Sequence, residues 1–335
     1  MAYHRSVSEA RQRSLIAVGF ILAGAIATGG EERRLGLIPG VSRLAATANG
    51  QTVRCLDGER GAIVSFEADR PAEWRDVVGP LVGFRCAAIG CLPGDLVVAV
   101  GQDADAWWLR SYRVEPGMTA DSAAPLQKIA LGEADATERP VAIVASSARG
   151  WLAIVGLPPP LPPVLRAAVA GVRIGPCSER SCPELPAGIR PLAATVSPRD
   201  ELVLVLPVEP AVGDPSRGDT VVYYDLTGRE RARFDSGVTA VRGIAFDRRG
   251  DTLCMVGQRT SDGQTGLWRL DAVLQGGRQS IRTTLVAAAV APRDLAAVAD
   301  RMLIMLTSDL SGTLVLVDPS PPVPVPPPIP GDASP

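Results

Sequence analysis

The side chains that could carry out chemistry are few in this sequence of 335 residues. It contains one histidine, His4, and one lysine, Lys128, so almost all of its positive charge is arginine. A single imidazole near the N-terminus excludes Ser-His-Asp and Cys-His nucleophile pairs and histidine-based zinc, copper or iron sites. Lys128 does not lie in a phosphate-binding loop, and no G-x-G-x-x-G motif is present. Any enzymatic activity must therefore use carboxylates, arginines, tyrosines or an external cofactor.

The six cysteines provide one candidate for a covalent link. Cys177 and Cys182 flank a loop-like segment, in which two Cα atoms can approach closely enough for a disulfide; two free thiols are the alternative. Cys86 and Cys91 lie on what reads as one strand, where five extended residues span roughly 16 Å, too far for a disulfide. The cysteine spacings match no zinc ribbon. The sequence therefore predicts no metal site, and it predicts no bound cofactor.

Residues 1–30 have the pattern of an export signal. Arg5, Arg11 and Arg13 precede an uncharged apolar run at 14–30. That run is a little shorter than the ~20 residues that a membrane-spanning helix needs. A cleaved signal peptide, an uncleaved membrane anchor and a buried core helix are the alternatives. Both the signal peptide and the membrane anchor place the rest of the chain outside the cytoplasm, in the periplasm or secreted, because the arginines that precede the apolar run stay on the cytoplasmic side.

The composition favours a fold built from many short strands. The chain is 46% hydrophobic and can bury a core, but it is only 4% aromatic and contains 34 glycines and 30 prolines. A formal net charge of −2 provides no basic field for nucleic acid. The proline-rich segment 320–335 is expected to form an extended or disordered tail.

One supersecondary unit recurs between residues 40 and 319. Segments 192–205 and 243–256 show it most clearly, as an apolar strand, a turn with Pro, Asp, Arg or Gly, and a second apolar strand. A third strand follows each pair, and most copies of it end on a carboxylate, as at Asp225 and Asp271. The turns recur with a mean period near 50 residues, which is in the range of propeller blades.

These repeats resemble those of the WD40-like and TolB-like β-propeller families. The turns Ser197-Pro198-Arg199-Asp200 and Asp247-Arg248-Arg249-Gly250 carry the likeness, although the Gly-His dipeptide and Trp-Asp pair of strict WD40 repeats are missing. The resemblance implies a β-propeller. Six copies of the third strand then predict an all-β chain with a single six-bladed β-propeller of four-stranded blades at 31–319, after an N-terminal hydrophobic helix. We expect the unpartnered segment 33–38 to supply the outer strand of the last blade, beside 313–318, because this closure removes two free sheet edges.

The fold that the resemblance implies does not choose a function, since propellers serve as scaffolds, receptors, hydrolases and quinone-dependent dehydrogenases. The predicted function is a non-catalytic protein-binding or scaffolding module, or an accessory subunit of a membrane complex with a membrane-associated protein partner. A calcium-dependent hydrolase or lactonase and a quinone-dependent dehydrogenase are the alternatives. The inner strands read as Ala, Val, Ile and Thr, without the basic or aromatic residues that a quinone needs or the carboxylates that calcium needs.

Arginines recur in the turns between the first two strands of successive repeats. Arg149, Arg199, Arg248 and Arg249 lie in or beside these turns, which all point to one face of a propeller. We expect that face to be locally basic and to meet an acidic protein or a membrane surface, because arginine binds carboxylates and phosphates well. Solvated turns whose charge is neutralised by neighbouring aspartates are the alternative.

Overall fold

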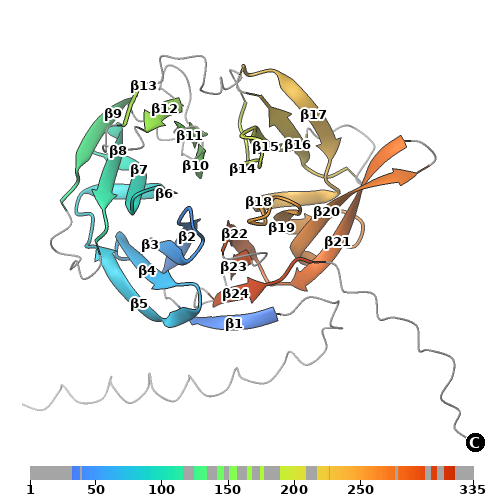
Figure 1. The fold of residues 1–335 in the computed structure, drawn as a ribbon, viewed down its shortest axis with the longest axis horizontal. Coiled ribbons are helices and arrows are strands. Elements are labelled where there is room, and N and C mark those ends of the chain that lie inside the picture. The colour runs from blue at the N-terminus through green and yellow to red at the C-terminus, as the bar shows by residue number, and fades with distance from the viewer. Residues whose placement is uncertain are drawn as a thin grey trace, which may run out of the picture.

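The chain forms a ring of small sheets (Figure 1). The computed structural model describes residues 32–320, with gaps at 38–39, 116–123, 134–141, 147–150, 157–163, 168–173, 177–188, 209–216, 226, 276–277, 299–302 and 308–312. The strands, sheet by sheet, are β2 (Val41–Ala46), β3 (Thr52–Asp57), β4 (Ala62–Glu67) and β5 (Arg70–Val78); β6 (Phe84–Leu92), β7 (Leu96–Asp103), β8 (Ala106–Arg113) and β9 (Gln127–Glu133); β10 (Ala142–Ser146), β11 (Trp151–Val155), β12 (Val164–Ala167) and β13 (Ile174–Pro176); β14 (Ala193–Val196), β15 (Leu202–Leu206), β16 (Thr220–Tyr224) and β17 (Glu230–Asp235); β18 (Val238–Phe246), β19 (Leu253–Arg259), β20 (Thr265–Gln275) and β21 (Arg278–Ala288); and β22 (Pro292–Ala297), β23 (Leu303–Thr307), β24 (Thr313–Val317) and β1 (Glu32–Leu37).

The described strands pair into six four-stranded sheets. In each sheet one strand lies nearest the ring centre, namely β2, β6, β10, β14, β18 or β22, and the following strands lie progressively further out (Figure 1). The prediction of an all-β propeller with four-stranded blades is confirmed.

The first strand of the chain completes the last sheet. β1 pairs antiparallel with β24, with Glu32 opposite Val317 and Leu37 opposite Thr313. The side chain of Leu35 is buried in the same apolar cluster as Leu314 and Ile304. The predicted pairing of segment 33–38 with segment 313–318 is therefore confirmed.

The turn residues of the repeat explain why each inner strand ends where it does. In the turn between β14 and β15, the Ser197 hydroxyl accepts hydrogen bonds from the backbone amides of Arg199 and Glu201 at 3.2 and 3.1 Å. In the turn between β18 and β19, Asp247 Oδ1 accepts from two later amides, and Gly250 takes a φ of 76°. Short polar side chains that satisfy turn amides, followed by a residue that tolerates positive φ, make these tight reversals.

Apolar side chains of neighbouring sheets fill the space between the blades. β11 is buried at every position because its sheet is covered on both faces. Between the next two sheets, Val203 of β15 packs in one cluster with Met255 of β19 and Trp268 of β20. The second and third strands of each blade thus form the core, and the inner strands are left to line the centre.

The predicted N-terminal hydrophobic helix and the proline-rich tail lie outside the described residues. Within residues 32–320, as far as they are described, no helix has the length and apolar character needed to cross a membrane.

Candidate functional site

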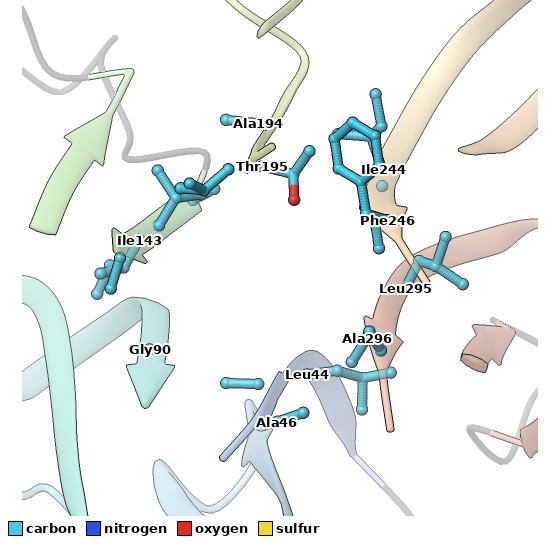
Figure 2. Close-up of a pocket in the computed structure, with 18 of the residues that line it drawn as sticks. Leu44, Ala46, Gly90, Ile143, Ala194, Thr195, Ile244, Phe246, Leu295 and Ala296 are labelled. Atoms are coloured by element: carbon cyan, nitrogen blue, oxygen red, sulfur yellow. The ribbon is translucent and has the colours of Figure 1, made fainter. Parts of the chain in front are cut away.

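A channel of about 420 Å³ runs between the inner strands at the centre of the ring. Figure 2 shows mainly apolar side chains around it, including Leu44, Ile143, Ile244 and Leu295. Neighbouring inner strands approach closely, since a Cβ added to Gly90 would lie 2.8 Å from a methyl group of Ile143. This crowded, apolar lining agrees with the composition of the inner strands.

A second cavity, of about 800 Å³, lies where the inner strands begin. We call it the mouth cavity; it shares Arg43 and Arg242 with the channel. Among its lining residues are four arginines and no carboxylate, the arginines being Arg43, Arg85, Arg242 and Arg293. They belong to β2, β6, β18 and β22, which are the inner strands of four different blades. The expectation that the inner strands carry no basic residues is therefore wrong.

Irregular backbone places two of these arginines at the cavity. In β18 and β22 the pairing register shifts across Arg242 and Arg293, which marks a β-bulge in each strand. Ala240 and Ala291, two residues earlier, also line the cavity and have φ of 51° and 45°. The left-handed conformation costs an L-residue roughly 1–2 kcal/mol. Bulges and strained residues of this kind are common beside functional sites, where they redirect a side chain.

The arginines give the lining of the mouth cavity a net positive charge. None of the ion pairs between described residues involves any of its four arginines. Arg85, Arg242 and Arg293 are exposed, and Arg43 is half-buried. Guanidinium groups bind carboxylates and phosphates through paired hydrogen bonds, and their combined field attracts anions. The mouth cavity is therefore a candidate anion-binding site.

Asp294 is a carboxylate of the channel wall, next in sequence to Arg293. Its Oδ2 accepts a hydrogen bond from the backbone amide of Leu44 at 2.9 Å, and its Oδ1 accepts from the amide of Leu295 at 2.9 Å. The first bond joins β22 to β2 of the next blade. Burial raises the pKa of Asp294, and nearby Arg43 opposes this shift.

We expect the substitution Asp294→Asn to change how stability depends on pH. Because the folded-state pKa of Asp294 is raised, its ionisation destabilises the folded chain. The wild-type free energy of unfolding should fall relative to that of Asp294→Asn as the pH rises from about 3.9, the ordinary pKa of aspartate, through the raised value. Urea unfolding at a series of pH values measures this difference. Asp225→Asn is the control and should give the opposite slope, because a hydrogen bond from the Thr227 hydroxyl lowers the pKa of Asp225 to about 2. A pH-independent difference for Asp294→Asn would contradict the prediction.

The turn arginines lie at the other end of the inner strands. Arg199, Arg248 and Arg249 are exposed in the turns that follow β14 and β18, whereas the mouth cavity lies where the inner strands begin. Arg149 lies outside the described residues. The proposed docking face at these turns is thus separate from the mouth cavity, and its role stays a prediction.

The predicted disulfide cannot be placed, since Cys177 and Cys182 lie outside the described residues. Cys86 and Cys91 both lie in β6 and are free thiols, as their spacing along one strand requires. Burial raises the pKa of Cys86 to about 12 and that of Cys91 to about 11. Both therefore stay protonated and unreactive at neutral pH.

Neither a protein-family model nor a curated protein matches this sequence. Several solved structures are similar to it in overall fold. The PQQ-bound aldose sugar dehydrogenase of Streptomyces coelicolor is 12% identical and matches 88% of this chain and 99% of its own, with a TM-score of 0.57. An oxidoreductase (glucose dehydrogenase) of Thermus thermophilus is 16% identical over 86% of this chain and 100% of its own, with a TM-score of 0.58. A chain of the mitotic checkpoint complex is 12% identical over 95% and 98%, with a TM-score of 0.53.

The chain is a β-propeller. The resemblance of its repeats to WD40-like and TolB-like propellers is confirmed at the level of the fold. The expectation of a non-catalytic binding or scaffolding propeller requires correction, because the similar structures include several sugar or glucose dehydrogenases. The expectation also depended on inner strands without basic residues, and the four arginines of the mouth cavity remove that support.

Proposed function

We propose that this propeller is an exported oxidoreductase that oxidises an aldose-type sugar with an anionic quinone cofactor. The observation that carries the proposal is the mouth cavity, with four arginines and no carboxylate in its lining. The aldose sugar dehydrogenase that the fold resembles binds PQQ, a quinone that carries several carboxylate groups. Export is inferred from residues 1–30, whose basic and apolar segments are typical of a signal.

The residues of the mouth cavity fit such a cofactor. Arg43, Arg85, Arg242 and Arg293 would hold its carboxylates by paired, charge-assisted hydrogen bonds. The neutral side chains of Gln102, Gln258 and Thr265 complete the polar lining without adding negative charge. A bound quinone would supply the acceptor for the hydride, two electrons and one proton, that leaves C1 of the sugar, a step for which this chain has few reactive side chains of its own.

A proton must also leave the sugar hydroxyl, and no histidine is present among the described residues to accept it. The channel wall offers the carboxylates of Asp247 and Asp294. Asp247 lies in the turn after β18, at the end of the inner strand that is far from the mouth cavity. Asp294 shares the channel lining with Arg43 and Arg242, which reach the mouth cavity, and burial makes it a stronger base than an exposed carboxylate. We therefore assign Asp294 as the candidate base.

The calcium-dependent hydrolase has less support than the oxidoreductase. Among the described residues, no group of three or more His, Cys, Asp or Glu side chains gathers in a way that could hold a metal ion. Four arginines around one cavity would also repel a divalent cation there.

The test is binding of PQQ to the purified protein, followed by dye-linked oxidation of aldoses. We expect PQQ to bind, and Arg242→Gln or Arg293→Gln to weaken binding by about 10- to 100-fold each, because each removes a charge-assisted contact of about 1.5–3 kcal/mol. The affinity of the wild type should also fall as salt is added. Arg249→Gln, at an exposed turn, is the matched control and should bind like the wild type. Absence of PQQ binding, or equal affinities in all variants, would refute the assignment.

A further inference from the structure

A third cavity, of about 870 Å³, adjoins the mouth cavity on its outer side. We call it the outer groove. The two share Arg85, Cys86, Gln102 and Trp107 as a common wall. The groove extends outward between the first two blades, along the β3–β4 turn at 58–61 and the β7–β8 turn at 104–105. The two cavities are therefore adjacent along this wall.

The groove carries polar side chains that are free to contact a ligand. Glu59 and Asp105 are exposed, and neither side chain takes part in a hydrogen bond or ion pair with other described residues. The turn that presents Glu59 is well fixed, because Asp57 Oδ1 accepts from the amides of Glu59 and Arg60 at 3.0 Å each. The Arg60 guanidinium is held in place by two 2.9 Å hydrogen bonds to Asp76. The groove is thus lined from a rigid turn, as a preformed site would be.

The two cavities differ in the charge that they present. The mouth cavity has four arginines and no carboxylate, whereas the groove presents Glu59 and Asp105. Arg60 of the groove is already neutralised by Asp57 and Asp76. An anion is therefore favoured in the first cavity and disfavoured in the second. A neutral ligand rich in hydroxyl groups fits the groove, because each hydroxyl can donate to a carboxylate and accept from a guanidinium or amide N–H.

We propose that the outer groove binds the distal sugar units of a neutral oligosaccharide whose reactive end lies in the mouth cavity. The inference rests on the proposed sugar oxidation and extends it by naming the substrate class. An oligosaccharide is favoured over a free monosaccharide, since a single sugar unit could not contact both cavities. Glu59, Asp105 and Gln102 then determine specificity and have no part in the redox step.

The test uses tetrasaccharide alditols, which lack an oxidisable reducing end, so binding is read without turnover or cofactor. Maltotetraitol, cellotetraitol and xylotetraitol are titrated into the full-length protein, with saturation-transfer NMR and calorimetry as readouts. We expect at least one to bind, and Glu59→Ala combined with Asp105→Ala to weaken binding at least tenfold. The control is Asp69→Ala, an exposed carboxylate at the β4–β5 turn, which should bind like the wild type. Unchanged melting temperatures establish that the variants are folded.

Two results would overturn the inference: no binding of any of the three alditols by the wild type, or equal binding by the double variant. A separate comparison in the PQQ-loaded protein should show a lower KM for a tetrasaccharide than for its monosaccharide, and the double variant should remove that difference. Alditol binding without PQQ binding would refute the proposed oxidation but leave the groove assignment intact. PQQ binding without alditol binding would refute the groove assignment but leave the proposed oxidation intact.

Discussion

We expect deletion of residues 31–40 to lower the free energy of unfolding by about 3 kcal/mol or more relative to the wild type. The deletion removes β1, and with it the antiparallel pairing to β24 and the buried side chain of Leu35. It also exposes the β24 edge and the apolar side chains that Leu35 covers, Leu314 among them. Urea or thermal unfolding of the two proteins gives the difference directly.

The matched control for this deletion is Arg34→Ala, which keeps the backbone of β1 and changes only an exposed side chain. Its unfolding free energy should stay within about 0.5 kcal/mol of the wild type. A synthetic peptide of residues 31–40 should restore part of the lost stability when added to the deleted chain, because it can pair with the free edge of β24. An unchanged midpoint after deletion would show that β1 contributes nothing to closure.

The substitution Trp268→Ala should lower the free energy of unfolding by about 3–5 kcal/mol, the range for removal of a large buried aromatic side chain. Trp268 is completely buried in β20, within the cluster that joins two neighbouring blades. Its Nε1–H donates to the carbonyl oxygen of Gly257 at 3.1 Å, and the Arg259 guanidinium lies 4.7 Å from its ring centroid. The substitution thus leaves a cavity, removes this hydrogen bond and deprives the Arg259 guanidinium of its aromatic contact.

Trp74→Ala provides the matched comparison, since Trp74 lies on the outer strand β5 and is 39% exposed. This substitution should lower the free energy of unfolding by about 1 kcal/mol or less. Chemical denaturation of both variants gives the two costs. Equal costs would contradict the view that the contacts between blades, rather than the outer surface, hold the ring together.

The blades could be predicted from the sequence because each is a local unit. Its strands are close in sequence, its turns carry residues with a clear conformational role such as Ser197 and Gly250, and the pattern repeats. The closure by β1 followed from a count of strands, which left one segment and one edge unpaired. Segments 157–163 and 177–188 lie outside the described residues.

The candidate site was missed because its arginines do not follow the alternation of a regular strand. Arg242 and Arg293 lie at β-bulges, where one extra residue changes the face to which the following side chains point. A period of two residues therefore cannot tell which side such a residue occupies. The useful signal was the position of arginine in the repeat. An arginine precedes the small apolar residues of the inner strand in all six repeats, as in Val241-Arg242-Gly243-Ile244-Ala245, and four of these arginines line the mouth cavity.

The pairing of β1 with β24 also determines when the protein can finish folding. Nearly all of the propeller sequence separates the two strands, so β1 has no partner until β24 has been synthesised. Individual blades can form as they are synthesised, because their contacts are local, whereas the ring stays open until the end. A chain that is translocated before its synthesis ends would therefore cross the membrane with its ring unclosed, and assembly would be completed at its destination.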